Sequence, residues 1–405
     1  MQVVIDGGRR QRSRPPPALP CAAGALASTP SSSDTVIAMT HPSRRLMLSG
    51  GLATLSGAAL AQTQHSQHGP HHPHRDGQFE RLNAPGRVDI PDIHHSQVYS
   101  ASPVPMAAHP GRWTPRAPLP IPRTEMAWAV GREGRMHLVG GYAEQRVDRP
   151  YHHVYDPAAN SWIAAAEVPR GANHVGVAVS GTKLYAIGGF IEQNRTPHAE
   201  CFVWGADGDR WTAIRPLPEA CGAIACVNMG ERIHAIGGAV GTTFANRKSI
   251  DWHLVYDPKD DRWTKLAPMP LGRDHTGIVA LNGLIHLIGG RVDSFHTNSV
   301  LHHVYDPKED KWTARNHMPT ARSGHGAVLY RGRIFCMGGE GWNRVYGQNE
   351  AYDPVADKWE AYAPMLTPRH GMGAVAIGDA IYVAGGGPQM GGGVKSAIHE
   401  AFTLA

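Results

Sequence analysis

The sequence predicts an all-β fold made of six repeats, each with four short antiparallel strands, and three periodic features predict it. Gly-Gly pairs end apolar runs at 140/141, 188/189, 237/238, 289/290, 338/339 and 385/386, at intervals of 47 to 52 residues. Tryptophans recur in phase with these pairs, at Trp113, Trp162, Trp211, Trp263, Trp312 and Trp359. A Tyr-Asp-Pro motif begins seven residues before four of the tryptophans, at Tyr155, Tyr256, Tyr305 and Tyr352. A fixed period of this length indicates one supersecondary unit per repeat.

The fourth repeat shows the four strands most clearly. Residues 278–281 form an apolar run, Asn282-Gly283 is a two-residue hairpin signal, and residues 284–288 return toward the Gly-Gly pair. After a variable loop, residues 301–305 form the third strand and Trp312 opens the fourth. Glycine allows a neighbouring backbone to approach closely, and a large indole fills the wedge between sheets. We therefore expect the glycine pairs and the tryptophans to lie where repeats meet.

The double glycine, the Tyr-Asp-Pro motif and the tryptophan together resemble the Kelch repeat over about residues 106–405. The resemblance implies a six-bladed β-propeller of Kelch type, with four-stranded antiparallel blades around a central channel. After Gly386 the chain offers a third strand at residues 400–402 but no further tryptophan, whereas Trp113 precedes every Gly-Gly pair. We therefore expect the N-terminal strand around Trp113 to close the ring as the outer strand of the last blade.

Residues 1–61 are interpreted as an upstream leader followed by a signal peptide. Residues 43–48, Ser-Arg-Arg-Leu-Met-Leu, resemble the twin-arginine export motif and lead into an apolar stretch that ends at Ala59-Leu60-Ala61. Small residues at that position are typical of a cleavage site. The sequence thus predicts a translation start at Met39, a mature chain from Gln62, and a bacterial protein that is exported to the periplasm or secreted.

Residues 62–105 show no periodic apolar pattern and are expected to form a His/Pro-rich linker. His71, His72 and His74 are weak metal-binding candidates, because imidazoles on a flexible chain can gather around an ion, but a solvated linker is the favoured interpretation. No cofactor is predicted.

Charge gives the mature chain little reason to bind nucleic acid. The leader carries six arginines and two aspartates, which account for +4 of the total formal charge of +5. Its apolar stretch is too short and too rich in glycine for a membrane span. We expect a monomer without nucleic-acid or membrane partners.

The four cysteines that follow the leader are too few for a disulfide framework. Cys226 and Cys336 lie in apolar strand patterns and are expected to be buried packing residues. Cys201 and Cys221 lie near strand starts in successive repeats, so a single disulfide between them stays open.

The resemblance also implies that the loops before each first strand and the loops after each Gly-Gly pair share one face, around the channel mouth. When the six repeats are aligned, the loops before the first strands hold basic and acidic side chains that are candidate ligand-binding residues: Arg123, Arg170, His174, Arg273, Asp274, Arg322, His325, Arg369 and His370. A ring of guanidinium groups at the mouth could bind a carboxylate, and the histidines could move protons near neutral pH. Pairing with neighbouring blades is the structural alternative.

Three acid-base residues at the same face are candidate catalytic residues. Glu219 stands in a loop where the other repeats have an arginine, and Glu125 and His275 lie in the equivalent loops of two other repeats. A second periodic set lies three residues before the tyrosine of the Tyr-Asp-Pro motif or its equivalent position in each repeat: His152, Cys201, His253, His302, Asn349 and His399. These positions are too far from the axis to converge on one ion, so we interpret them as anchors for loops.

Three functions stay open. The first is an exported binding module that recognises a protein or carbohydrate at the channel mouth, using loops on a rigid scaffold. The second is an enzyme of the sialic-acid mutarotase kind, with Arg322 or Arg273 holding the carboxylate of an acidic sugar and Glu219 or Glu125 as acid or base. The most remote is a copper radical oxidase similar to galactose oxidase, a family that has a seventh blade and flanking domains.

Overall fold

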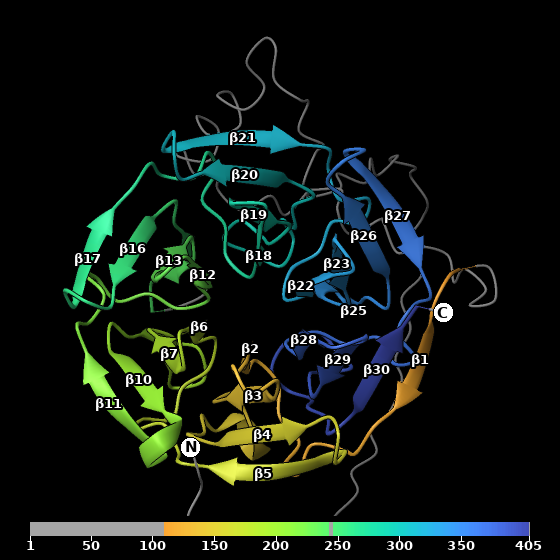
Figure 1. The fold of residues 1–405 in the computed structure, drawn as a ribbon, viewed down its shortest axis with the longest axis horizontal. Coiled ribbons are helices and arrows are strands. Elements are labelled where there is room, and N and C mark those ends of the chain that lie inside the picture. The colour runs from red at the N-terminus through yellow and green to blue at the C-terminus, as the bar shows by residue number, and fades with distance from the viewer. Residues whose placement is uncertain (1–108, 243–245, 405) are drawn as a thin grey trace, which may run out of the picture. The chain divides into compact units, whose positions relative to one another are not determined.

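The computed structural model describes residues 109–242 and 246–404. The leader, the linker and the candidate metal residues His71, His72 and His74 lie outside the described residues. The described chain forms six four-stranded antiparallel sheets arranged radially around a central axis (Figure 1). This confirms the predicted six-bladed propeller. Within these residues, no helix is both long and apolar enough to cross a membrane.

The first three blades follow one another along the chain, and each runs from its innermost to its outermost strand. Blade 1 contains β2 (Ala127–Val130), β3 (Met136–Val139), β4 (His152–Asp156) and β5 (Ser161–Ala165). Blade 2 contains β6 (Gly176–Ser180), β7 (Lys183–Ile187), β10 (Cys201–Gly205) and β11 (Arg210–Ile214). Blade 3 contains β12 (Ala225–Met229), β13 (Arg232–Ile236), β16 (His253–Asp257) and β17 (Arg262–Lys265).

The remaining blades repeat this order. Blade 4 contains β18 (Gly277–Leu281), β19 (Leu284–Ile288), β20 (His302–Asp306) and β21 (Lys311–Arg315), close to the bounds that the sequence predicts. Blade 5 contains β22 (Gly326–Tyr330), β23 (Arg333–Met337), β26 (Asn349–Asp353) and β27 (Lys358–Tyr362). Blade 6 contains β28 (Gly373–Ile377), β29 (Ala380–Ala384), β30 (His399–Thr403) and, from the other end of the chain, β1 (Arg112–Pro115).

Short elements decorate the loops between second and third strands. They are the ribbons β8 (Phe190–Ile191) with β9 (Thr196–Pro197), β14 (Ala239–Val240) with β15 (Lys248–Ser249), and β24 (Glu340–Gly341) with β25 (Arg344–Val345), and the 3-10 turn η3 (Glu144–Arg146). A second 3-10 turn, η4 (Ala206–Gly208), joins β10 to β11.

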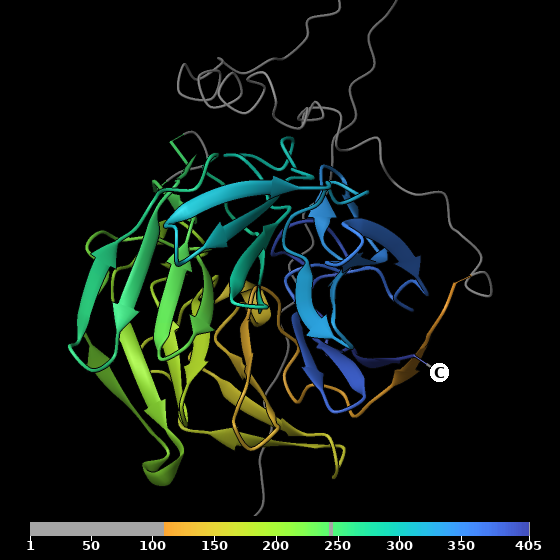
Figure 2. The same ribbon diagram turned by 45° about the horizontal axis from the view of Figure 1, so that its top comes forward.

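The ring is closed by β1, as predicted. It pairs antiparallel with β30, with Trp113 opposite Phe402, and Figure 2 shows this orange strand at the outer edge of the blue last blade. The Trp113 indole is 5% exposed, packs 5.2 Å from the Phe402 ring and donates from Nε1 to the Ala363 carbonyl of blade 5 at 2.7 Å. The two ends of the propeller are thus held in one sheet, and blade 6 has four strands like the other blades.

The repeated tryptophans link neighbouring blades at the rim. Five further indole Nε1 groups donate to main-chain carbonyls of the preceding blade at 2.8–3.0 Å: Trp162 to Ala117, Trp211 to Ala166, Trp263 to Arg215, Trp312 to Ala267 and Trp359 to Asn316. A buried or half-buried indole that finds an acceptor contributes apolar packing without leaving its N–H unpaired.

The histidines of the third strands pack between the blades as well. His253 lies 4.3 Å from the Tyr305 ring and His399 lies 4.4 Å from the Tyr155 ring, each in the next blade, measured between centroids. His399 Nδ1 also donates to the Ala117 carbonyl, which fits the loop-anchoring interpretation. Burial lowers the pKa of His253 to about 3 and that of His399 to about 4. These rings are therefore neutral packing groups near pH 7.

The Gly-Gly pairs lie where one blade meets the next. Gly140 and Gly141 both have positive φ, +67° and +93°. A Cβ atom on Gly140 would lie 2.5 Å from the carbonyl oxygen of Ala172 in blade 2, a distance that real side chains do not adopt. The close backbone approach predicted for these pairs is confirmed.

The innermost strands line a central cavity of about 430 Å³ whose wall is mostly Ala, Val and Ile side chains. In the described part of the chain, Cys201, Cys221, Cys226 and Cys336 are free thiols. The disulfide between Cys201 and Cys221 that the sequence left open is therefore not formed. Cys336 is fully buried and Cys226 is partly buried, in line with packing roles.

Candidate functional site

The loops before the first strands and the loops after the Gly-Gly pairs meet on one face of the ring, called here the loop face. In all six blades, the residue that follows the Gly-Gly pair forms a backbone bridge with a residue of the preceding loop. The bridges are Thr124 with Tyr142, Asn173 with Phe190, Gly222 with Ala239, Asp274 with Arg291, Ser323 with Glu340, and His370 with Gly387. The shared face implied by the repeat resemblance is thus present, and the bridges set the true register of the loops.

One residue further along, each blade contributes one residue to the narrow end of the channel. These neck residues are Glu125, His174, Ala223, His275, Gly324 and Gly371, and they line a cavity of about 90 Å³. All six adopt left-handed backbone, with φ between +51° and +61°. Backbone N–H groups donate from Glu125 to Gly371, from His174 to Glu125, from Ala223 to His174, from Gly324 to His275 and from Gly371 to Gly324, at 2.8–3.1 Å. These bonds join five of the six pairs of neighbouring blades at the neck, all except the pair of Ala223 and His275.

Three neck residues, Glu125, His174 and His275, carry ionisable side chains at a conformational cost. Left-handed backbone costs an L-residue about 1–2 kcal/mol, whereas glycine adopts it freely. Gly324 and Gly371 show that glycine satisfies this position in two blades of the same ring. Glu125, His174 and His275 therefore occupy strained positions that the fold does not require them to fill. Strain of this kind is typical of functional sites.

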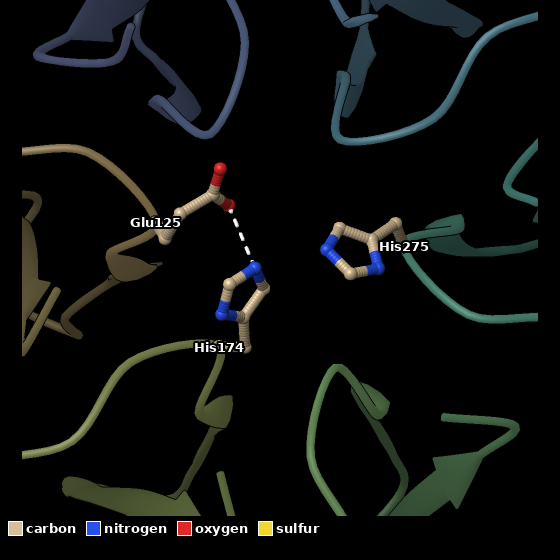
Figure 3. Close-up of side chains that lie close together, drawn as sticks. All are labelled: Glu125, His174 and His275. Carbon is tan, nitrogen blue, oxygen red and sulfur yellow. Dashed lines mark ion pairs between the residues drawn. The ribbon is translucent and has the colours of Figure 1, made fainter. Parts of the chain in front are cut away.

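The side chains of Glu125, His174 and His275 point toward one another from three different blades (Figure 3). His174 Nε2 lies 3.1 Å from Glu125 Oε2, and the two imidazole rings lie 4.6 Å apart between centroids. All three side chains are at most 6% exposed. The Nδ1 atom of each histidine bonds to the preceding side chain, Asn173 for His174 and Asp274 for His275. Each ring is thereby held with Nε2 toward the centre.

A network of charges surrounds these three residues. His370 Nε2 lies 2.9 Å from Glu125 Oε1 and 3.2 Å from Glu340 Oε2. Arg291 donates to Glu340 Oε1 at 2.9 Å and to Asp274 Oδ1 at 3.1 Å, and its Nη2 lies 2.9 Å from His275 Nε2. Because all these groups are buried, each charge depends on its partners for stability.

The network shifts the pKa values of its members in opposite directions. Burial opposes the charge of Glu125, but His174 and His370 hold the pKa of this carboxyl well below its usual range. Burial likewise opposes the charge of His370, but Glu340 and Glu125 raise its pKa to about 9. Burial and Arg291 lower the pKa of His275 to about 4. Near neutral pH, His370 is thus a cation and His275 is a neutral imidazole.

The arginines predicted for the channel mouth are turned into their own blades. Arg123, Arg273, Arg322 and Arg369 are fully buried, with 0% exposure. Their guanidinium groups donate to main-chain carbonyls, for example from Arg123 to Gly140 at 2.8 Å and from Arg322 to Cys336 at 3.0 Å. Burial lowers the pKa of Arg123 to about 10 and that of Arg273 to about 9. The expected ring of guanidinium groups at the mouth is therefore not formed, because these groups are held inside the blades by main-chain carbonyl acceptors.

Three further predicted residues also lie away from the neck. In blade 2, Ala172 occupies the position equivalent to Arg123. Arg170 lies two residues before Ala172 and forms an ion pair with Glu200. Glu219 is exposed and lies two residues before the equivalent place in blade 3, so it is not among the described residues that line the neck. His325 follows the neck residue Gly324 and is buried in the channel wall, where it packs against glycines of blade 4.

The structure therefore brings together five of the residues named from the sequence: Glu125, His174, Asp274, His275 and His370. It adds two charged residues, Arg291 and Glu340, that sequence reasoning missed. Both directly follow a Gly-Gly pair, where the other blades have Tyr, Phe, Ala and Gly. A charged residue at that otherwise uncharged position was the available signal.

Comparisons with known proteins agree with this architecture. The family model described as "KLHDC2/KLHL20/DRC7 Kelch-repeats domain" matches residues 173–386, more than half of the chain. Kelch-like protein 35 of Homo sapiens is 37% identical over 187 residues, covering 46% of this chain and 28% of that protein. Kelch-like protein 23 of Mus musculus is 27% identical over 156 residues, covering 38% of this chain and 27% of that protein. The chain thus spans little more than a quarter of the length of these curated relatives.

A solved structure entitled "Structure of YjhT" is similar in fold. It matches with a TM-score of 0.61 at 14% sequence identity, over 70% of this chain and 95% of that one. At this identity the likeness concerns the fold alone. With the repeat motifs, the six closed blades and the match over more than half of its length, the chain belongs to the Kelch-repeat family.

Proposed function

We propose that this chain is an interaction module that binds a protein ligand on its loop face. The membership in the Kelch-repeat family supports this proposal, since a Kelch propeller suggests a protein-interaction module. The backbone bridges in all six blades support it as well, because they hold the variable loops on one rigid surface.

The observation that carries the proposal is Trp342. This side chain lies in the short ribbon between β24 and β25 on the loop face and is 45% exposed. Its indole stacks on the imidazole of His296 from the neighbouring blade, with 3.9 Å between ring centroids and 29° between planes. Exposed tryptophans held in one orientation are typical anchors of protein interfaces, because they bury a large apolar area at little entropic cost.

The test compares two exposed positions on opposite faces of the full chain. A photo-crosslinking residue replaces Asn343, which is exposed beside Trp342, in one variant and Val355, which is 94% exposed in the turn between β26 and β27, in the other. We expect crosslinks to a specific protein from position 343 and none from position 355. Crosslinks from position 355 alone, or from neither position, would contradict the proposal. Binding of a glycan array that is lost in Trp342→Ala, without any protein crosslink, would replace the protein ligand with a carbohydrate.

An enzyme acting on an acidic sugar is the second candidate. The neck favours it at one point: the Glu125 carboxylate lies between two imidazoles, His174 and His370, beside the central cavity, a constellation suited to proton transfer. The four buried arginines are not available to hold the carboxylate of a sugar as the resemblance implied, whereas the Arg291 guanidinium lies 2.9 Å from His275 Nε2 at the neck. The test follows the anomers of sialic acid by NMR. An accelerated exchange that Glu125→Gln abolishes would support the enzyme, and an unchanged exchange rate with the unaltered chain would reject it.

We further propose that the mature chain works outside the cytoplasm of a bacterium, after removal of residues 1–61. The paired arginines 44 and 45 and the small residues before Gln62 support this. N-terminal sequencing of the exported protein should begin at Gln62. A start far from Gln62, or retention of the protein in the cytoplasm, would contradict it.

A further inference from the structure

We propose that Glu125, His174 and His275 bind a divalent first-row transition metal ion of the Zn²⁺ class at the neck. This site goes beyond the proposed protein interaction and does not depend on it. The three residues offer one carboxylate oxygen and two imidazole nitrogens, and these donor atoms all lie within 4.8 Å of one another. Two imidazoles and one carboxylate form a donor set that Zn²⁺ and related ions accept, with the remaining positions left for water or a ligand.

The distances are close to those a bound ion needs. Ligand atoms about 2.1 Å from a tetrahedral Zn²⁺ ion are separated from each other by about 3.4 Å. His174 Nε2 and Glu125 Oε2 are already 3.1 Å apart. The His275 donor nitrogen lies within 4.8 Å of the other two donor atoms, so side-chain rotations are needed to bring it to the spacing of a bound ion.

Both imidazoles have the outer partners that metal-binding histidines use. A metal-ligating histidine donates its other ring N–H to a carboxylate or carbonyl oxygen, which fixes the tautomer and aims the lone pair at the metal. His275 Nδ1 bonds to the Asp274 carboxylate and His174 Nδ1 bonds to the Asn173 side-chain oxygen. In both cases Nε2 faces the centre of the neck, as Figure 3 shows. This second set of contacts points to a metal independently of the donors themselves.

The surrounding charges favour this set of donors over the second candidate set, Glu125, Glu340 and His370. Glu340 and His370 also lie near Glu125, but His370 directs Nδ1 at the Gly387 carbonyl and Nε2 at the two carboxylates. His370 Nε2 thus lies between two carboxylates, whereas His174 Nε2 faces one, so a metal in the second set would have to displace two ion-pair contacts instead of one. Arg291 Nη2 lies 2.9 Å from His275 Nε2, so metal binding requires this contact to break, after which Arg291 keeps Asp274 and Glu340 as partners. Asp274 and Glu340 therefore offset the positive charge of Arg291 beside the ion.

Zn²⁺ binding to the full chain tests the proposal, with one precaution and one internal control. Histidines 65, 68, 71, 72, 74, 94 and 95 of the N-terminal segment are replaced by Asn in every sample, because imidazoles there would compete for Zn²⁺. In this background His174→Gly and His275→Gly each remove one donor while keeping the backbone conformation that glycine adopts in blades 5 and 6. Ala223→Gly makes the same backbone change at a neck residue without a donor.

We expect one Zn²⁺ per chain by calorimetry, a Co²⁺ derivative with visible d–d absorption, and a loss of affinity of about tenfold or more in each histidine variant. Ala223→Gly and Trp342→Ala should bind Zn²⁺ as the background does. The proposal fails if the background binds no Zn²⁺, if the histidine variants bind it unchanged, or if Ala223→Gly weakens binding as much as they do. Because Zn²⁺ is measured without a protein partner, failure of the protein interaction leaves this result unaffected.

Discussion

The rim and the neck of the propeller use the repeat in opposite ways. At the rim, equivalent positions carry the same residue, and six tryptophans make the same bond to the preceding blade. At the neck, equivalent positions share only their backbone conformation, and the six side chains include a carboxylate, two imidazoles, a methyl group and two glycines. Identical residues thus mark the contacts that assemble the ring. Variation at a fixed backbone geometry marks positions that are free to carry function.

The largest effect that would sharpen this comparison is expected at the rim where the ring closes. Trp113→Ala removes a 5% exposed indole, its contact with Phe402 and its bond to Ala363. We expect the free energy of unfolding in denaturant to fall by about 3–5 kcal/mol. Trp263→Ala, at a partly exposed indole of the same set, should cost less. Equal and small losses in both variants would contradict the importance of closure.

The next effect is acid sensitivity of the rim. Burial lowers the pKa of His253 to about 3, whereas the unfolded side chain titrates near its ordinary value of 6.5. Above pH 6.5 the ring is neutral in both states and stability does not depend on it. Below pH 6.5 only the unfolded chain takes up the proton, so stability falls by up to about 1.4 kcal/mol per pH unit.

The matched variant is His253→Asn, because blade 5 has Asn349 at the equivalent place. Its free energy of unfolding, measured between pH 6 and pH 4.5, should decrease less steeply than that of the unaltered chain, by about 2 kcal/mol over this range. Parallel pH profiles would show that this histidine is solvated in the folded state.

A smaller effect is expected at the neck from Gly324→Ala. The nearest atoms to a Cβ added there lie 3.8 Å away, so space is not limiting, but φ is +61°. The left-handed backbone alone should therefore cost about 1–2 kcal/mol of unfolding free energy, measured in denaturant. A neutral result would mean that the neck does not hold its residues in left-handed backbone, and would remove the strain argument for the functional site.

The smallest effect is expected from the reverse change, Ala223→Gly. Relief of the left-handed strain at φ +53° is offset by the greater freedom of glycine in the unfolded chain. The free energy of unfolding should stay within about 1 kcal/mol of the unaltered value. A large destabilisation would show that the methyl group of Ala223 is needed for packing, which would make the neck similar to the rim.

The fold followed from the sequence because its determinants recur. The Gly-Gly pair and the tryptophan each recur six times at equivalent positions, so the pattern cannot be a chance match. The strands of blade 4 begin and end within one residue of their predicted bounds. Closure by Trp113 followed from the same count of motifs. The site was harder to predict, because function depends on positions where the repeats differ.

The spacing of Arg and His in the loops gave an incorrect register in two blades. It placed Arg170 and Glu219 beside Arg123, whereas the backbone bridges place Ala172 and Cys221 there. The arginine side chains were expected at the mouth because sequence patterns do not show main-chain acceptors. The carbonyls of Gly140 and Cys336, which bind Arg123 and Arg322, become visible only in the folded blade. Glu125, His174 and His275 were named, but their convergence depends on a turn that the sequence does not signal.

The backbone hydrogen bonds of the neck have a consequence for engineering. Because five of the six pairs of successive neck residues are joined through main-chain N–H and C=O groups, these links do not rely on any particular side chain. Gly324 and Gly371 leave two of the six neck positions without a side chain, on the blades that separate His275 from Glu125. A designer could install a further donor group at Gly324, where an added Cβ atom would lie 3.8 Å from its nearest neighbours, but not as simply at Gly371, where it would lie 2.7 Å from the Glu125 carboxyl.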